Sequence, residues 1–295
     1  MRRVAGPVLC LFLALPASAL AAPPRSIVDA PIRTVEAGKA TVGYRSIGEG
    51  RPLVMIMGFT GTMDAWPPSF VDALAARRRV IVFDNEGIRR SSAGRAPLTI
   101  GRMARRTAAL IRALRLRRPD VLGWSMGGMI AQSLARQRPR RVRRLVLCAT
   151  APGNGKATLP AADLIADLSE PGTSQANLLS YMFPTDPAAG EAFVRGIVSY
   201  PNAGPAAPPE VVRAQFGAAG SWLAGGDPTG RPLSRLRLPV LVGGGELDRI
   251  LPVANQRHLG RRLPRARMKI YPDAGHGFLF QHQRDWLRRM NRFLS

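Results

Sequence analysis

The chain has 295 residues, 46% of them hydrophobic, so it can bury a large core, which excludes a disordered protein. Its 43 Lys and Arg residues against 19 Asp and Glu give a formal net charge of +24, a balance found in proteins that bind nucleic acid or anionic membranes. Nearly all these cations are arginines, scattered along helical stretches without interleaved aromatic residues. That pattern disfavours nucleic acid as a partner and is typical of a compositional bias.

The first 21 residues have the composition of a secretory signal peptide. Arg2 and Arg3 precede an apolar run from Val8 to Leu15, and small residues follow up to Ala21, after which we expect cleavage. The apolar run is short of the ~20 residues that cross a bilayer. We therefore expect an exported protein, periplasmic or secreted, whose mature form has no membrane span and retains Cys148 as its single cysteine.

A predicted hairpin at residues 31–50 is followed by short apolar runs that alternate with amphipathic stretches. Each run has four to six apolar residues followed by turn formers, which is typical of strands buried on both faces of a parallel sheet. Residues 100–114 carry apolar side chains on one face at helical spacing and arginines elsewhere, which predicts an amphipathic helix. The six runs are "PLVMIMG", "RVIVFDN", "DVLGWS", "RLVLCAT", "PVLVGGGE" and "RMKIYPDAG". The sequence therefore predicts the α/β class, with a mostly parallel central sheet and flanking helices.

This alternation stops between residues 152 and 232. The segment reads as short helices separated by loops rich in Pro and Gly, and the strand rhythm resumes at Leu238. We therefore expect a helical cap at 152–232, inserted between two parts of one core, residues 22–151 and 233–295.

The third strand run leads into Gly123-Trp124-Ser125-Met126-Gly127, which fits the pattern G-x-S-x-G. A strand candidate precedes Ser125 and a helix candidate follows it, so the serine is predicted at a strand-to-helix turn. Glycines on either side let the backbone turn tightly and hold the serine in a strained conformation. The alternative is a glycine-rich turn with an idle serine. Chemistry at Ser125 requires a base, an acid and an anion hole elsewhere in the chain.

His276 is the candidate for the base. It lies in "YPDAGHGF", on a loop after the last predicted strand, where an imidazole can reach across the end of the sheet toward Ser125. The other histidines, His258 and His282, lie in or beside predicted helices and are interpreted as surface or structural residues.

Asp248 is the candidate for the acid, because it also follows a predicted strand, in "VLVGGGELDRILP". Two other carboxylates compete with it. Glu246 lies too close to its own strand, and Asp273 is only three residues from the candidate base.

Two backbone N–H groups are predicted to form the oxyanion hole. One belongs to Met126, the residue after the serine, and the other to the loop "GFTGTMDAW" after the first parallel strand. Gly58 lets this loop turn inward, which makes Phe59 the second donor. A plain glycine-rich turn is the alternative for this loop.

With these segments in order, the sequence resembles the α/β-hydrolase fold family over residues 52–294. The resemblance is carried by "MGFTG", "FDNEGIRRSS", "GWSMGG", "GGGELDRILP" and "DAGHGF". It implies Ser125, Asp248 and His276 as nucleophile, acid and base, under a cap. Two departures affect the mouth of the pocket: Met57 replaces a histidine that many members have, and Arg89 replaces a common glycine.

The expected function is hydrolysis of an ester or related carbonyl bond through an acyl-enzyme, with a small-molecule substrate and no metal or organic cofactor. A cofactor-free perhydrolase resembling the haloperoxidases, a C–C bond hydrolase and an aminopeptidase stay open, because members of the family share the same three residues. A non-catalytic binding protein with this fold, and a basic protein that binds anionic polymer or membrane, are the remaining alternatives.

Aromatic and apolar residues near these segments are candidates for a substrate pocket, which would select a small or medium, mainly apolar compound. Plain core packing is the alternative for each of them. The candidates are Met63, Trp66, Trp124, Phe183 and Trp222. The oligomeric state cannot be derived from the sequence.

Overall fold

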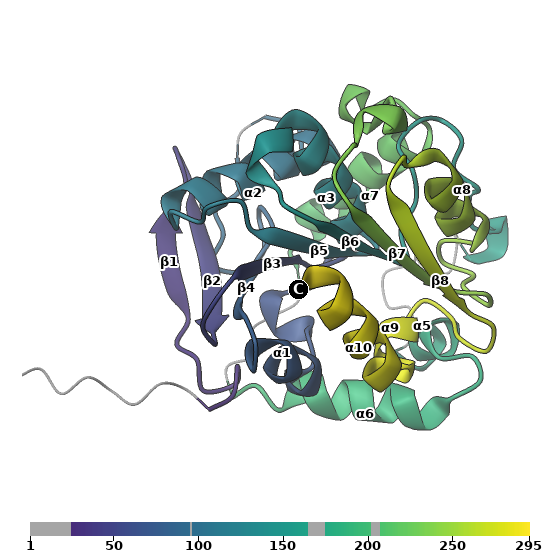
Figure 1. Ribbon diagram of the computed structural model, residues 1–295, viewed down its shortest axis with the longest axis horizontal. Helices are drawn as coiled ribbons and strands as arrows, with labels where there is room; N and C mark the ends of the chain where they lie inside the picture. Colours follow the sequence, from purple (N-terminus) through teal and green to yellow (C-terminus); the bar gives the residue numbers. More distant parts are fainter. Residues whose placement is uncertain (1–24, 95, 165–174, 202–206) are drawn as a thin grey trace, which may run out of the picture.

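The computed structural model describes residues 25–94, 96–164, 175–201 and 207–295 (Figure 1). The predicted signal peptide, residues 1–21, lies outside the described residues. One eight-stranded sheet crosses the described part of the chain in the order β1-β2-β4-β3-β5-β6-β7-β8. The strands are β1 (Arg33–Glu36), β2 (Thr41–Ile47), β3 (Pro52–Ile56), β4 (Arg79–Phe83), β5 (Asp120–Trp124), β6 (Leu145–Cys148), β7 (Val240–Gly245) and β8 (Ala266–Tyr271).

Strand directions confirm the predicted architecture. β1 and β2 form the expected hairpin, in which Glu36 pairs with Thr41 and Gly38 takes a positive φ of 75° in the turn. β2 also runs antiparallel to β4, whereas all the pairings from β4 through β3 to β8 are parallel. The carboxyl ends of the parallel strands therefore meet at one edge of the sheet.

Apolar side chains of the parallel strands point to both faces of the sheet. In β3, Val54 and Ile56 join one hydrophobic cluster and Leu53 and Met55 join the other. Since successive side chains of a strand point to opposite faces, a strand buried on both faces needs an unbroken apolar run. This requirement explains why the runs in the sequence were continuous instead of alternating.

Helices cover both faces of the sheet (Figure 1). On one face lie α2 (Ile100–Ala113), α3 (Met126–Gln137) and α8 (Ala254–Arg262), and on the other lie α1 (Pro68–Ala75), α9 (Phe278–Gln281) and α10 (Gln283–Leu294). α2 is the predicted amphipathic helix. It begins after Thr99, whose side chain accepts a hydrogen bond from the Arg102 N–H at 3.0 Å and so caps the first turn.

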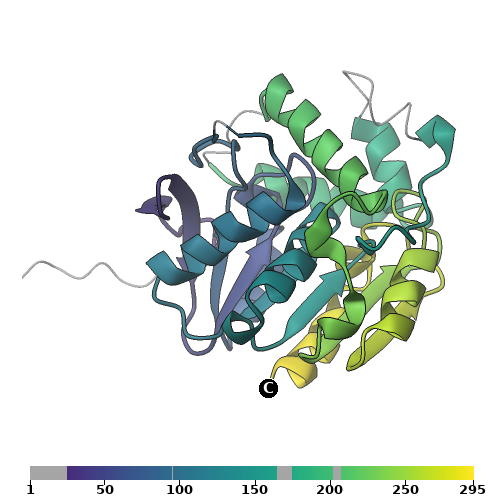
Figure 2. The ribbon, with the colours of Figure 1, turned by 90° about the horizontal axis from the view of Figure 1, so that it is seen from above.

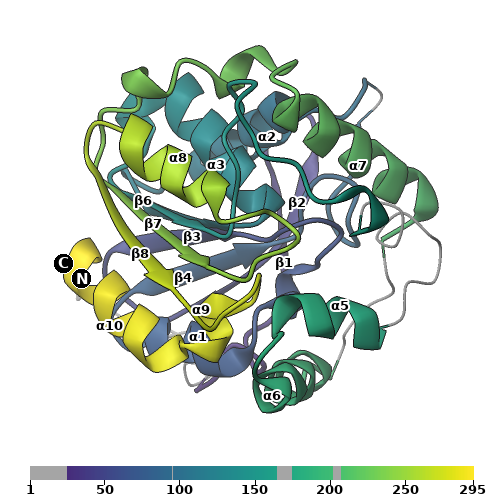
Figure 3. The ribbon, with the colours of Figure 1, turned by 90° about the vertical axis from the view of Figure 1, so that its right-hand side faces the viewer.

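Among the described residues between β6 and β7 are the helices α5 (Gln175–Met182), α6 (Pro187–Val198) and α7 (Pro209–Leu223). α7 packs against α2 and α3, while α6 packs against α1 and α9, so the insertion reaches the helices on both faces of the sheet (Figures 2 and 3). A helical cap was expected here, and its boundaries at 152 and 232 stay a prediction. In the four described ranges, no helix combines the length and apolar character needed to cross a bilayer.

Candidate active site

Ser125 lies at the turn between β5 and α3, with φ 57° and ψ −126°, a conformation that is costly for a residue with a side chain. Close packing leaves room only for glycine beside it. A Cβ at Gly123 would lie 2.2 Å from the Gly127 carbonyl oxygen, and a Cβ at Gly127 would lie 2.0 Å from that of Ile56. The Ser125 N–H donates to the carbonyl of Cys148 in β6 at 2.9 Å. The turn is therefore fixed by three neighbouring strands.

His276 and Asp248 come from loops after β8 and β7 and meet at the edge of the sheet. His276 Nδ1 lies 2.9 Å from Asp248 Oδ2, and each residue is 4% exposed. The other carboxylate oxygen, Oδ1, accepts hydrogen bonds from the N–H groups of Ile250 and Leu251, both at 2.9 Å. These bonds hold the carboxylate in place, and the carboxylate in turn fixes the orientation of the imidazole.

The competing carboxylates have other partners. Asp273 accepts from His282 Nε2 at 2.9 Å on the surface, and Glu246 forms an ion pair with Arg257 at 2.6 Å. The structure thus brings only Asp248, among the three candidate acids, to His276.

Trp124, the residue before Ser125, contacts His276. Its indole Nε1 donates to the backbone oxygen of His276 at 3.1 Å, and the two rings lie 5.6 Å apart between centroids. Within the described ranges, the Ser125 hydroxyl makes no hydrogen bond, so the Oγ–Nε2 contact is not formed in this conformation. Such contacts are often long before substrate binds. The contacts of Trp124 thus hold the residue before Ser125 against the loop and ring of His276.

The loop after β3 packs directly on Ser125. A Cβ at Gly58 would lie 3.0 Å from the Cβ and 3.6 Å from the Oγ of Ser125, so the next residue, Phe59, is carried close to the hydroxyl. The second predicted donor, Met126, is the first residue of α3, and its N–H therefore has no acceptor within the helix. Both predicted donors thus come from segments that adjoin Ser125.

Two side chains that the sequence did not indicate hold this loop. Asn85 Nδ2 donates to the carbonyl of Met57 at 3.0 Å, and the Thr60 N–H donates to Gln215 Oε1 at 2.8 Å. Gln215 belongs to α7 and is fully buried, so the insertion supports the same loop that carries Phe59. Met57, the first departure from the family pattern, is buried in the core.

The insertion also closes over the loop of His276. The Gly277 N–H donates to the carbonyl of Met182 at 2.9 Å, and the His276 N–H donates to that of Tyr181 at 3.5 Å. A Cβ at Gly277 would lie 2.5 Å from the ring of Phe183. Glycine is therefore required where the end of α5 covers the base.

Of the candidate pocket residues, four lie in one cluster. Trp66 lies 6.0 Å from Trp124 between ring centroids, and Met63 and Phe183 belong to the same cluster. Phe193 of α6 and Phe280 of α9, which the sequence did not indicate, complete it at 6.3 and 5.1 Å from Trp124. Trp222 lies apart, in the cluster on the other face, where its Nε1 donates to the carbonyl of Ala151.

A buried carboxyl group lies beside this region, at the end of β4. Asp84 is 1% exposed; its Oδ1 accepts from the Met63 N–H at 2.8 Å, and its Oδ2 has no hydrogen-bond partner in the described part. Burial raises the pKa of Asp84 to about 6. The neighbouring Asp64 is paired with Arg45 and with Arg89 at 2.9 and 2.6 Å. Arg89, the second departure, thus has a buried partner and a positive φ of 42°.

Metal-binding side chains do not gather here. Among residues 25–94, 96–164, 175–201 and 207–295, no three His, Cys, Asp or Glu side chains converge as a set of ligands. His258, the remaining histidine, interacts with Asn154 Nδ2 at 3.1 Å, away from this site.

Comparisons with known proteins agree with this architecture. The family model described as alpha/beta hydrolase fold matches residues 51–283. A pimeloyl-(acyl-carrier protein) methyl ester esterase from Aromatoleum aromaticum is 32% identical over 174 residues, which is 56% of this chain and 69% of the relative. A Mycobacterium tuberculosis protein provisionally named a non-heme bromoperoxidase is 32% identical over 250 residues, 81% of this chain and 92% of the relative. The solved structure of an alpha/beta hydrolase fold protein from Chitinophaga pinensis superposes with a TM-score of 0.80 at 28% identity and covers 91% of this chain and 98% of that one.

Proposed function

Because this chain belongs to the α/β-hydrolase fold family, we propose that it is a serine hydrolase that cleaves an ester or related carbonyl bond. The proposal depends chiefly on the buried His276–Asp248 pair, which adjoins the strained turn at Ser125. In the proposed roles, Ser125 is the nucleophile, His276 the base and Asp248 the acid.

The first half of the reaction forms an acyl-enzyme. His276 Nε2 takes the proton from the Ser125 hydroxyl while Oγ attacks the carbonyl carbon of the substrate. Asp248 stabilises the resulting imidazolium, and the N–H groups of Phe59 and Met126 hold the oxyanion of the tetrahedral intermediate. His276 then passes its proton to the leaving oxygen, and the alcohol departs.

The second half repeats these steps with water. His276 takes a proton from a water molecule, the hydroxide attacks the acyl carbon, and the returning proton restores the Ser125 hydroxyl as the carboxylic acid leaves. His276 carries every proton, and apart from Ser125 no other side chain gains or loses one.

The proposed substrate is a small to medium, mainly apolar compound. The support is the aromatic cluster beside His276, in which Trp66, Trp124 and Phe193 surround the Phe280 ring. The relative named as a methyl ester esterase supports ester chemistry. The predicted role of Trp222 has less support, since this side chain lies in the other cluster.

Perhydrolysis is a second candidate, favoured by the relative provisionally named a bromoperoxidase. It uses the same acyl-enzyme but lets hydrogen peroxide replace water in the second half, which yields a peracid. The two candidates differ only in the nucleophile that reaches the acyl carbon.

A fluorophosphonate probe tests the proposal without a known substrate. We expect stoichiometric phosphonylation of Ser125, detected by peptide mass spectrometry, and loss of the label in the His276→Ala variant. The matched control is His282→Ala, which removes a surface histidine and should leave labelling unchanged. A folded protein that takes no label on Ser125 would contradict the proposal. Unlabelled protein from the same preparation is then assayed with p-nitrophenyl esters, with and without peroxide, to distinguish hydrolysis from perhydrolysis.

Export is a separate proposal, which rests on the composition of residues 1–21. Amino-terminal sequencing of protein recovered from the periplasm or the medium of an expressing bacterium should begin at Ala22. A cytoplasmic protein with an intact amino terminus would contradict it.

A further inference from the structure

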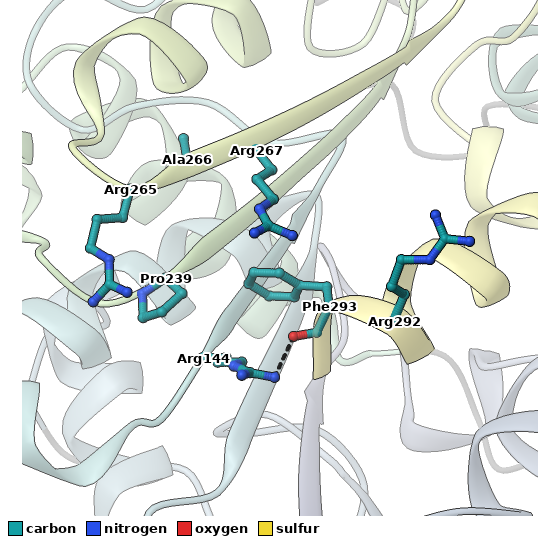
Figure 4. Close-up of a pocket in the computed structure, with 7 residues that line it drawn as sticks. All are labelled: Arg144, Pro239, Arg265, Ala266, Arg267, Arg292 and Phe293. Atoms are coloured by element: carbon teal, nitrogen blue, oxygen red, sulfur yellow. Dashed lines mark hydrogen bonds between the residues drawn. The ribbon is translucent and has the colours of Figure 1, made fainter. Parts of the chain in front are cut away.

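A pocket lined mainly by arginines lies at the opposite end of the sheet from Ser125. It has a volume of about 450 Å³, a size typical of small-molecule sites. Its position follows from the strand starts, because Arg144, Pro239 and Arg265 directly precede β6, β7 and β8. The lining residues are Arg144, Pro239, Arg265, Ala266, Arg267, Arg292 and Phe293 (Figure 4).

Within the described ranges, none of the four arginines of this pocket forms an ion pair with an Asp or Glu side chain, although the buried Asp120 acts on Arg144 from a distance. Nearby cations differ in this respect: Arg143 is paired with Asp120 at 2.7 Å, and Arg289 is paired with Asp285 at 2.6 Å. Arg265, Arg267 and Arg292 are exposed, while Arg144 is half-buried. The pocket therefore concentrates positive charge, of which only that of Arg144 is partly offset, by the buried Asp120.

Arg144 is a fixed cation at the base of this pocket. Its Nη1 donates to the backbone oxygens of Phe293 and Ser295, and its guanidinium lies 5.7 Å from the Phe293 ring centroid (Figure 4). Burial lowers the pKa of Arg144, and the neighbouring cations Arg143, Arg51 and Arg267 lower it further. These cations repel one another, and a bound anion would relieve that repulsion.

We propose that this arginine pocket binds a phosphoryl-bearing anion. Guanidinium groups present parallel N–H donors that match phosphate oxygens two at a time, and several of them face one cavity. The Phe293 ring and Pro239 add an apolar wall on which an organic part of the ligand can pack. Nothing in this site involves Ser125, so the proposal stands or falls independently of the proposed hydrolase function.

A neighbouring hollow provides an internal comparison. It is smaller, about 240 Å³, and is lined by Asp285, Arg288, Arg289 and Arg292. Asp285 pairs with both Arg288 and Arg289 there, so a carboxylate already occupies this hollow and balances one of its three positive charges. The anion is therefore assigned to the larger pocket, where such a carboxylate is missing from the described lining.

The test uses the full protein, with inorganic pyrophosphate as the probe, in isothermal titration at constant ionic strength. We expect saturable binding that the double variant Arg265→Gln/Arg267→Gln weakens about tenfold or more. The matched control is Arg105→Gln/Arg112→Gln, which removes the same charge from exposed positions of α2 and should change the affinity less than about twofold. Absence of binding, or equal weakening in both double variants, would overturn the proposal.

The phosphoryl group has two possible sources, a free metabolite or a lipid headgroup. Sedimentation with vesicles of phosphatidylcholine, with and without phosphatidic acid, separates them. Retention by phosphatidic acid vesicles that the Arg265→Gln/Arg267→Gln variant loses indicates a lipid. Pyrophosphate binding without retention indicates a soluble ligand, and failure in both assays rejects the site.

Discussion

The two ends of the same sheet differ in how much of their charge is paired within the protein. At the carboxyl ends of the strands, charged groups are buried and paired, as His276 is with Asp248 and Arg89 with Asp64. At the amino ends, Asp120 is likewise buried and paired, with Arg78 and Arg143, but the arginines of the pocket form no ion pair with an Asp or Glu side chain in the described residues. The insertion accounts for part of this difference, because the end of α5 lies over the loop of His276 at the carboxyl ends, where Met182 accepts a hydrogen bond from the Gly277 N–H. Burial favours either pairing of a charge or, as at Asp84, its neutralisation, whereas exposed arginines can keep their charge for a ligand.

Replacement of the proposed nucleophile should have the largest effect, and it should affect only the carboxyl end of the sheet. Ser125→Ala is expected to lower kcat/KM for an ester substrate by at least ~1,000-fold, because no other hydroxyl can form the acyl-enzyme. Pyrophosphate binding should not change, since the arginine pocket lies at the other end of the sheet. Steady-state kinetics and titration of the same preparation check both. Parallel losses of activity and binding would show that the two ends are not independent.

The next largest effect is expected from replacement of the proposed acid, Asp248. Asp248→Asn should lower kcat by roughly 100- to 10,000-fold, because the imidazolium loses its counter-charge and the wrong tautomer is favoured. The matched control is Asp273→Asn, which removes the surface partner of His282 and should change kcat less than about twofold. Steady-state kinetics of both variants with one ester substrate compare the buried His276–Asp248 pair with the exposed His282–Asp273 pair. Similar losses would contradict the assignment of the acid.

The buried Asp84 carboxyl should make stability depend on pH. Its pKa is about 6 in the folded protein and lower in the unfolded chain, so the stability that it contributes is complete below about pH 4 and is lost as pH rises through 6. The loss amounts to about 3 kcal/mol. Asp84→Asn should remove it, so that wild type and variant diverge between pH 4 and 7 in urea unfolding. Two parallel stability curves would contradict the elevated pKa.

The smallest effect is expected where the insertion supports the loop of Phe59. Gln215→Ala removes the acceptor of the Thr60 N–H and should lower kcat about tenfold, with little change in KM, because the oxyanion donor is held less firmly. Arg213→Ala, a change at an exposed position of the same helix, is the control and should leave kcat and KM unchanged. A change in KM alone would assign Gln215 to substrate binding instead.

Local sequence patterns predicted much of the sheet and the segments that carry Ser125, Asp248 and His276 in the candidate site. Unbroken apolar runs identify doubly buried strands, and Gly123 and Gly127 mark a turn that no larger residue fits. The strand order then brings Asp248 and His276 together, because both follow neighbouring strands, β7 and β8. These features depend on short segments whose physics is local.

Other features depend on contacts between distant segments and left no pattern in the sequence. Gln215 and Phe193 lie on inserted helices, and only the packing of those helices shows that they reach the loop of Phe59 and the ring of Trp124. Trp222 was assigned to the pocket with the other aromatic residues, but it packs against Gly153 on the other side. The arginine pocket collects residues from 144 to 293, which only the sheet order makes neighbours.

The turn at Ser125 also has a consequence for the order of folding. Its N–H bonds to β6, and its glycines fit against β3, so the turn cannot take its native form until β3, β5 and β6 have paired. These pairings are parallel and join segments far apart in the chain, which are slow to form. Reactivity of Ser125 should therefore appear only after these three strands have paired, so fluorophosphonate labelling during refolding would report when this part of the sheet is complete.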